Sequence, residues 1–261
     1  MRPVIITANW KMNTTPADAG PLAADIAKAT DVAGVTRIIC PPYVSLATVK
    51  DALAGTDVAV GAQNVHAEAK GAYTGEISVS MLTGLVSWAI IGHSERRRDQ
   101  LESDELIGKK VVRLVEAGIS PMLCCGEQLE QREAGSAVAT VQAQVKAALE
   151  VVMAEGNGLP ADLVIAYEPV WAIGTGKTAT GADAAEMANA IRATVADLGG
   201  AEYAESVPIL YGGSVTAASF AEFLDEPSID GALIGGSSLK PDEMSGIAAT
   251  AASAAATRAN V

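Results

Sequence analysis

The chain has 261 residues, with 31 acidic and 18 basic side chains and a formal net charge of −13 at pH 7. An acidic protein repels the phosphate backbone of nucleic acid unless a basic patch reverses the local charge. The densest basic run, Arg96-Arg97-Arg98, is flanked by Glu95 and Asp99, so we expect no nucleic-acid partner. Hydrophobic residues make up 49% of the chain, which excludes extensive disorder and supplies a large core.

Membrane segments and cysteine-based sites are not expected. No wholly apolar run approaches the roughly 20 residues that cross a bilayer, and polar Asn9 and Lys11 come too early for a signal peptide. Cys40, Cys124 and Cys125 are odd in number and lack CxxC spacing, which favours buried thiols over a disulfide framework or a zinc site. We therefore expect a cytoplasmic protein with no membrane partner and no metal.

Eight short apolar runs recur along the chain, and their length and β-branched content predict buried strands. They span residues 4–8, 37–40, 58–61, 88–91, 121–124, 163–167, 208–211 and 232–234. Longer Ala-rich stretches between them have the spacing of amphipathic helices. The predicted helices span residues 17–29, 104–117, 137–155, 182–198 and 241–256.

This alternation predicts an α/β fold with a parallel sheet, because strands that are apolar on both faces must be covered on both. No linker or charge block divides the chain, so we expect one domain over residues 1–261, a (β/α)8 barrel of eight parallel strands surrounded by helices. A doubly wound open sheet is the alternative. Its G-x-G-x-x-G turn is absent, since Ala8-Asn9-Trp10-Lys11 follows the first strand.

Polar residues and glycines follow several of the predicted strands directly. In a parallel barrel the carboxyl ends of all strands meet at one face, where catalytic groups lie. We therefore expect these residues to converge. They are Asn9 and Lys11 after the first strand, His93, Ser94 and Glu95 after the fourth, Glu168 after the sixth, Gly212-Gly213-Ser214 after the seventh, and Gly235-Gly236-Ser237 after the eighth.

Four segments resemble those of the triosephosphate isomerase family, and the resemblance runs from the first strand to the last helix. They are Asn9-Trp10-Lys11-Met12-Asn13, Gly92-His93-Ser94-Glu95-Arg96-Arg97, residues 166–177 and Tyr211-Gly212-Gly213-Ser214-Val215. The resemblance implies a TIM barrel and a glycolytic and gluconeogenic isomerase. Its substrates would be small phosphorylated sugars, dihydroxyacetone phosphate and D-glyceraldehyde 3-phosphate, interconverted through an enediolate without metal or organic cofactor.

The residues also support this chemistry directly. Moving a proton between neighbouring carbons of an α-hydroxy carbonyl needs a base for the carbon and an electrophile for the oxygen. Glu168 is the candidate base, and His93 is the candidate electrophile and proton shuttle. A helix starting near residue 94 would disfavour protonation of the imidazole. Lys11 would supply positive charge, and the resemblance places Asn9 and Glu95 beside it, with Ser94 in a supporting role.

The two glycine turns predict a phosphate site. Gly212-Gly213 and Gly235-Gly236 allow backbone amides to approach an anion, and a short helix over residues 236–239 would direct its N-terminus at a phosphate. Ser214 adds a hydroxyl. Such turns are weak signals alone, but phosphate sites of these barrels follow the last two strands.

The segment 169–179 reads as a mobile lid. It combines apolar Val170, Trp171 and Ile173 with glycines. A nucleotide-binding P-loop is excluded, because that motif needs glycine at the position of Trp171. The resemblance assigns the Gly174 amide to the phosphate and the Tyr211 hydroxyl to holding the closed lid.

A homodimer is implied by the resemblance, in which the loop 71–77, with Thr74, enters the neighbouring subunit. Two positions depart from the family where that loop would be received: Gln100 and Leu101 stand where an aromatic residue and glycine are usual. We therefore expect a dimer that dissociates more readily. Ser237 also stands where alanine is usual.

Two other functions remain open from the residues. The motifs describe a phosphate and an enediol, so an isomerase of a four-carbon ketose (tetrulose) phosphate would carry the same ones. A non-catalytic binding protein that keeps the barrel is an alternative of another class, although intact Lys11, His93 and Glu168 weigh against it.

Overall fold

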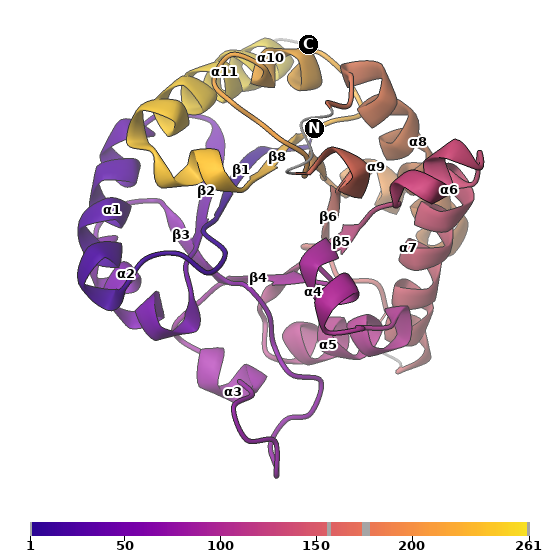
Figure 1. The fold of residues 1–261 in the computed structure, drawn as a ribbon, viewed down its shortest axis with the longest axis horizontal. Coiled ribbons are helices and arrows are strands. Elements are labelled where there is room, and N and C mark those ends of the chain that lie inside the picture. The colour runs from indigo at the N-terminus through magenta and orange to yellow at the C-terminus, as the bar shows by residue number, and fades with distance from the viewer. Residues whose placement is uncertain (1, 156–157, 174–177, 260–261) are drawn as a thin grey trace.

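Eight parallel strands form a closed barrel in chain order, surrounded by helices (Figure 1). The computed structural model describes residues 2–155, 158–173 and 178–259. The strands are β1 (Val4–Asn9), β2 (Val35–Cys40), β3 (Ala59–Ala62), β4 (Trp88–Ile91), β5 (Ser120–Cys125), β6 (Val164–Tyr167), β7 (Ile209–Tyr211) and β8 (Gly231–Ile234). The predicted (β/α)8 barrel is confirmed, and the open sheet is excluded because β1 pairs with β8.

Side chains on the two faces of the strands enter separate apolar clusters. One cluster consists of strand residues alone and fills the barrel interior. The other joins the outward faces of the strands to the helices. This division explains why the strands are apolar throughout rather than alternating. The interior cluster contains Ile5, Ile38, Cys40, Ile90, Met122, Cys124, Val164, Ala166, Leu210 and Leu233.

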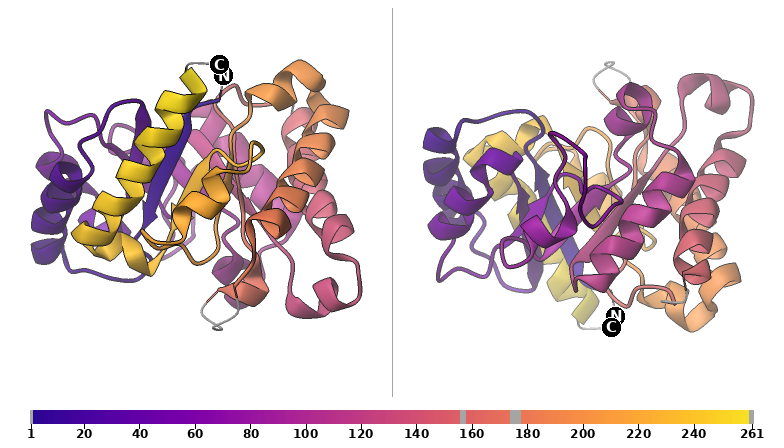
Figure 2. Two further views of the ribbon diagram at one scale, coloured as in Figure 1. Left: turned by 90° about the horizontal axis from the view of Figure 1, so that it is seen from above. Right: turned by 90° about the horizontal axis from the view of Figure 1, so that it is seen from below.

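Five long helices cover the barrel, each within three residues of its predicted bounds (Figure 2). They are α1 (Pro16–Ala29), α5 (Asp104–Glu116), α7 (Ala137–Ala154), α8 (Gly181–Gly199) and α11 (Pro241–Ala259). The short α4 (Ser94–Asp99) and the 3-10 turn η3 (Gly236–Leu239) also form where short helices were expected. The other short elements are η1 (Tyr43–Ser45), α2 (Leu46–Ala52), α3 (Val79–Leu82), α6 (Leu129–Glu133), η2 (Val170–Ala172), α9 (Ala201–Ser206) and α10 (Phe220–Leu224).

Local hydrogen bonds explain where two long helices begin. The Ser103 hydroxyl accepts from the Leu106 amide at 3.2 Å and caps α5. At α8, the Thr180 hydroxyl accepts from the Asp183 amide at 3.1 Å, and the Asp183 carboxylate accepts from the Thr180 amide at 2.9 Å. This reciprocal pair satisfies two amide donors that the first turn leaves free.

Helix α7 is long and apolar enough by composition to cross a membrane, with 18 residues and a mean hydropathy of 1.2. It packs against α5 and α8 in the helical layer and buries Val141, Val145 and Leu149 in the core. About a third of the helix is buried in this packing.

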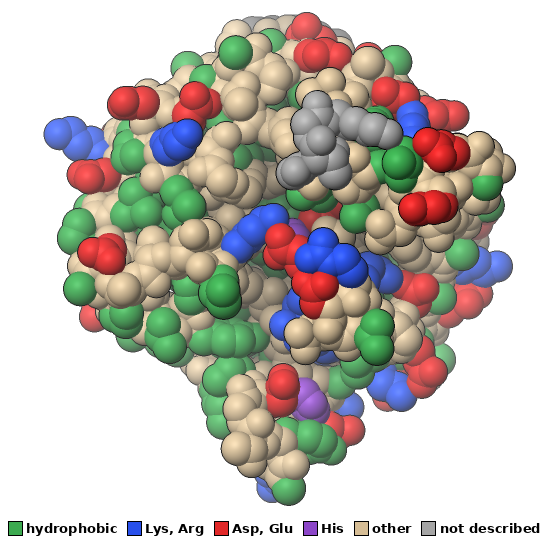
Figure 3. Space-filling model, in the orientation of Figure 1, with side chains coloured by type: hydrophobic (Ala, Val, Ile, Leu, Met, Phe, Trp, Pro, Cys, Tyr) green, Lys and Arg blue, Asp and Glu red, His purple; other side chains and the backbone are tan. Residues whose placement is uncertain are grey.

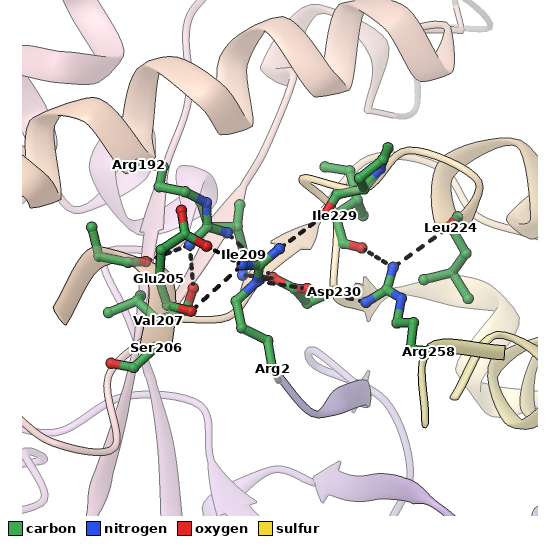
Figure 4. A network of polar contacts seen from close by, with 12 residues as sticks. Arg2, Arg192, Glu205, Ser206, Val207, Ile209, Leu224, Ile229, Asp230 and Arg258 are labelled. Carbon is green, nitrogen blue, oxygen red and sulfur yellow. Dashed lines mark hydrogen bonds and ion pairs between the residues drawn. The ribbon is translucent and has the colours of Figure 1, made fainter. Parts of the chain in front are cut away.

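Asp230, just before β8, ties the two ends of the chain to the barrel (Figure 4). Its fully buried carboxylate lies 2.9 Å from Nε of Arg2, 3.4 Å from Arg192 and 3.1 Å from Arg258. It also accepts from the Ile209 amide at 2.9 Å. Burial raises the pKa of Asp230 even though three guanidinium groups surround it.

The three cysteines are buried thiols, as the sequence predicts. Cys40, Cys124 and Cys125 are free and buried, and burial raises the pKa of each thiol.

The segment between β3 and α3 projects from the barrel (Figure 1). Within it, the His66 ring packs against Tyr73 at 4.4 Å between centroids, which gives His66 a structural contact.

Candidate active site

A cavity of about 330 Å³ opens at the carboxyl ends of the strands. Its volume lies near the small end of the range for ligand pockets, about 300–1,000 Å³, which suits a small ligand. Acidic, basic and histidine side chains gather around the centre of this face in the space-filling view (Figure 3). The cavity brings together residues from five strand ends. They include Asn9, Lys11, His93, Glu168, Gly212, Gly213, Ser214, Gly235, Gly236 and Ser237.

Glu168 follows β6 and is 1% exposed. Its Oε2 accepts from the backbone amide of Ser94 at 2.7 Å, at the start of α4. Its Oε1 lies 2.9 Å from Nε2 of His93. The buried carboxylate therefore faces the imidazole directly within the lining of the cavity.

Glycines beside Glu168 set its backbone position. A Cβ on Gly126 would lie 1.8 Å from the Glu168 carbonyl oxygen, and a Cβ on Gly212 would lie 2.9 Å from Glu168 Cγ. No side chain fits at either position without moving the glutamate. The Glu168 amide also donates to the Cys125 carbonyl at 2.8 Å, which continues the β5–β6 pairing past the strand.

His93 is the residue immediately before α4, and its Nδ1 accepts from the Glu95 amide at 3.3 Å. This bond assigns the ring proton to Nε2, the atom that faces Glu168. Burial lowers the pKa of His93, but Glu168 and Glu95 raise it further, and the net direction is upward. The expected effect of the helix start, which disfavours protonation, is therefore opposed by the two nearby carboxylates.

Lys11 is held on three sides. Its Nζ lies 2.7 Å from Glu95 Oε1, its amide donates to Asn9 Oδ1 at 3.0 Å, and Gln63 donates to its carbonyl at 2.9 Å. Its φ of 51° is a left-handed conformation that is costly for a residue with a side chain. Burial raises the pKa of Glu95, but the bond from Lys11 and the neighbouring His93 lower it below its usual range.

The glycine turns after β7 and β8 line the same cavity next to the polar groups. A Cβ on Gly212 would lie 2.9 Å from Glu168 Cγ, and a Cβ on Gly235 would lie 3.4 Å from Lys11 Cε. The Ser214 hydroxyl donates to the Ala172 carbonyl at 3.4 Å, which links the β7 turn to η2. Gly174, which the sequence also assigns to the phosphate, lies outside the described residues.

Tyr211 and Thr74 lie apart from the cavity lining. The Tyr211 ring is buried and stacks on Phe223 with 3.8 Å between centroids. A Cβ on Gly213 would lie 2.2 Å from the Tyr211 hydroxyl, so this hydroxyl is directly below the β7 turn. Thr74 is exposed in the projecting loop.

The sequence interpretation missed Glu127, which follows β5. Its carboxylate is fully buried and accepts from the Tyr167 hydroxyl at 3.0 Å and from Trp171 Nε1 at 2.7 Å. Arg132 lies 3.4 Å from the same carboxylate and 4.8 Å above the Trp171 ring. Polar residues that directly follow strands were expected at the catalytic face. The same expectation applies to Glu127 after β5 and to Gln63 after β3.

No cluster of three or more His, Cys, Asp or Glu side chains that could hold a metal ion occurs in the part of the chain that the structure describes. Among these described residues, the polar side chains that line the cavity are one carboxylate, one imidazole, one ammonium group, the amide of Asn9 and the hydroxyls of Ser214, Thr216 and Ser237.

Comparison with known proteins places these features in a family. A family model described as triosephosphate isomerase matches residues 4–251. The chain is 44% identical over 253 residues to the triosephosphate isomerase of Dehalococcoides mccartyi, covering 97% of this chain and 98% of the relative. It is 47% identical over 249 residues to that of Carboxydothermus hydrogenoformans, with 95% and 98% covered. For that of Thermus thermophilus, identity is 47% over 241 residues, with 92% and 95% covered.

Proposed function

The chain belongs to the triosephosphate isomerase family, and from this premise we propose that Glu168, His93 and Lys11 carry out its reaction. The activity is the interconversion of dihydroxyacetone phosphate and D-glyceraldehyde 3-phosphate, a step of glycolysis. An isomerase of tetrulose phosphates and a non-catalytic barrel are not favoured, since these relatives all bear the name of the triose enzyme.

The observation that carries the proposal is the position of the Glu168 carboxylate. It is buried in the cavity lining, and its Oε1 lies 2.9 Å from Nε2 of His93. In the proposed reaction this oxygen removes a proton from the carbon next to the carbonyl, and the electron pair of that C–H bond forms the enediolate double bond. The same carboxyl then returns the proton to the neighbouring carbon.

His93 and Lys11 act on the oxygens of the enediolate. The Nε2–H of His93 donates to the developing oxyanion and transfers its proton between the two oxygens. The ammonium group of Lys11, paired with Glu95, supplies positive charge near these oxygens, while Asn9 accepts from the Lys11 backbone amide. Both groups favour the charged intermediate over the neutral substrate, which is the condition for lowering the barrier.

The phosphate group is bound by backbone amides of the two glycine turns other than that of Gly212, which donates to the Tyr167 carbonyl at 2.7 Å, with Ser214 beside them. The supporting observation is that Gly212, Gly213, Gly235 and Gly236 line one cavity with Glu168. An acidic chain must concentrate such donors locally to hold an anionic substrate. Gly174 remains a proposed phosphate contact from the lid, and the Tyr211 hydroxyl a proposed contact of the closed lid.

We further propose a homodimer that works in the cytoplasm. Five of the six large hydrophobic side chains that are exposed among the described residues lie in connections that follow β1 to β4. A concentration of exposed apolar side chains on one side of a soluble barrel favours an interface. They are Met12, Val44, Tyr73, Met81 and Leu101. The three free cysteines are compatible with a reducing compartment.

Substitution of Glu168 tests the assignment. Glu168→Gln removes the base but keeps the side-chain volume, and we expect turnover to fall by roughly 10²- to 10⁴-fold or more. Glu168→Asp keeps a carboxylate and withdraws it by one methylene, so we expect a smaller loss than for Gln. Turnover is measured with dihydroxyacetone phosphate, and circular dichroism checks the fold. A folded Gln variant with wild-type turnover would remove Glu168 from the mechanism.

A further inference from the structure

The two glycine turns of the cavity are weakly connected by the sheet itself. Strand β7 has three residues and pairs with β8 through one residue pair, Tyr211 with Ala232. Beyond that pair β7 ends, whereas β8 continues along β1 to Ile234, so the two turns are attached to different neighbouring strands. The β7–β8 ladder alone therefore does not fix the distance between the turn at 212–214 and the turn at 235–236, and a direct contact between the turns would do so.

A side-chain hydrogen bond joins the two turns. The Ser237 hydroxyl donates to the Val215 carbonyl at 2.6 Å, and both residues line the cavity. A second link lies outside the lining: the Glu243 carboxylate at the start of α11 accepts from the Ala217 amide at 2.8 Å. Ser237 is thus the residue that connects the turns at the wall of the cavity itself.

We infer that Ser237 is a positioning residue that sets the spacing between the two amide turns, so that both can bind the same phosphate group. Its hydroxyl proton is directed at Val215 rather than at the ligand, so its effect on the phosphate passes through the backbone. A binding site that is ordered before the ligand arrives loses less conformational entropy on binding. The inference rests on the proposed phosphate site.

The test measures inhibition by inorganic sulfate together with kcat and KM. In the wild type, sulfate should compete with dihydroxyacetone phosphate. In Ser237→Ala we expect the inhibition constant for sulfate and the KM to rise about 3- to 10-fold, the loss typical of one hydrogen bond, with a smaller change in kcat. Ser237→Thr retains the hydroxyl and should restore both constants. Ser237→Cys, a weaker donor, should resemble Ala.

Ser206→Ala is the matched control. The Ser206 hydroxyl donates to the Tyr203 carbonyl at 2.7 Å in exposed α9, away from the cavity lining, so its loss should leave all three constants unchanged. Non-competitive or absent sulfate inhibition in the wild type would overturn the phosphate site, and the inference with it. Competitive inhibition in the wild type with the same constant in Ser237→Ala would overturn the role of Ser237 alone. A Ser237→Thr variant that folds but fails to restore the constants would also overturn that role.

Discussion

At the scale of single residues, the Glu168 carboxylate affects the protonation of His93. The carboxylate lies 2.9 Å from Nε2 and contributes to the raised pKa of His93. In the proposed reaction Glu168 acts on the substrate carbon, and its contribution to this pKa would then weaken. Burial and the N-terminus of α4, which donates to Nδ1, would then favour the neutral ring that can donate from Nε2.

We therefore predict that Glu168→Gln lowers the pKa of His93. The sign follows from the charge: glutamine removes the anion that stabilises imidazolium and leaves the desolvation that opposes it. An NMR titration of the two histidines measures the shift, and His66→Gln identifies the second resonance. An unchanged or higher pKa of His93 in the variant would contradict this electrostatic account.

Glu127 acts at the scale of elements, because it joins β5, β6 and η2 through one carboxylate. We predict that Glu127→Leu lowers the free energy of unfolding by about 1–3 kcal/mol, since the buried Tyr167 hydroxyl loses its acceptor. Turnover should also fall, because Trp171 lies at the start of the proposed lid. Urea denaturation and steady-state kinetics measure both effects.

Glu127→Gln is the matched variant, because it keeps an amide oxygen that can accept from Tyr167. Its loss of stability should be smaller than that of the leucine variant. Equal stability of the wild type and Glu127→Leu would show that the carboxylate does not hold these elements together.

Asp230 acts on the whole molecule, because Arg2 and Arg258 attach the two ends of the chain to its carboxylate. We predict that Asp230→Asn lowers the free energy of unfolding by about 3–5 kcal/mol, since three partly buried guanidinium groups lose their counter-ion. Glu205→Gln removes an exposed partner of Arg2 and should cost less than about 1 kcal/mol. Similar losses in the two variants, compared by urea denaturation, would refute a special role for Asp230.

The proposed dimer also concerns the whole molecule. Thr74→Arg should produce an inactive monomer if the exposed loop 71–77 completes the neighbouring site. Sedimentation velocity and specific activity across a dilution series measure this, and a monomer active at every concentration would contradict it.

Substitutions at Gln100 and Leu101 test how tightly the proposed dimer associates. Both are exposed, and Leu101 has a φ of 54°, a conformation that glycine adopts at no steric cost. Gln100→Phe with Leu101→Gly should tighten association roughly tenfold, as expected for about one to two kcal/mol from an aromatic contact. An unchanged dissociation constant would show that these positions do not weaken the dimer.

Sequence alone predicted the eight strands, the long helices and the closed barrel, because these follow from local apolar patterns and a strand–helix repeat. It also placed Lys11, His93, Glu168 and the glycine turns at strand ends, where a parallel barrel must bring them to one face. The short helices α9 and α10 were missed, since five or six residues carry too little periodicity to identify a helix.

Only the tertiary structure decided how these groups act on one another. The pairing of Glu127 with Trp171, the bond from Ser237 to Val215 and the convergence of three arginines on Asp230 join residues that are 22 to 228 positions apart. The raised pKa of His93 also depends on a contact between distant residues. A helix start can be predicted from neighbouring residues, but the pKa depends on a carboxylate 75 residues away that the closed barrel brings within 2.9 Å. Electrostatic and hydrogen-bond energies depend on distances in space, which a strand pattern does not specify.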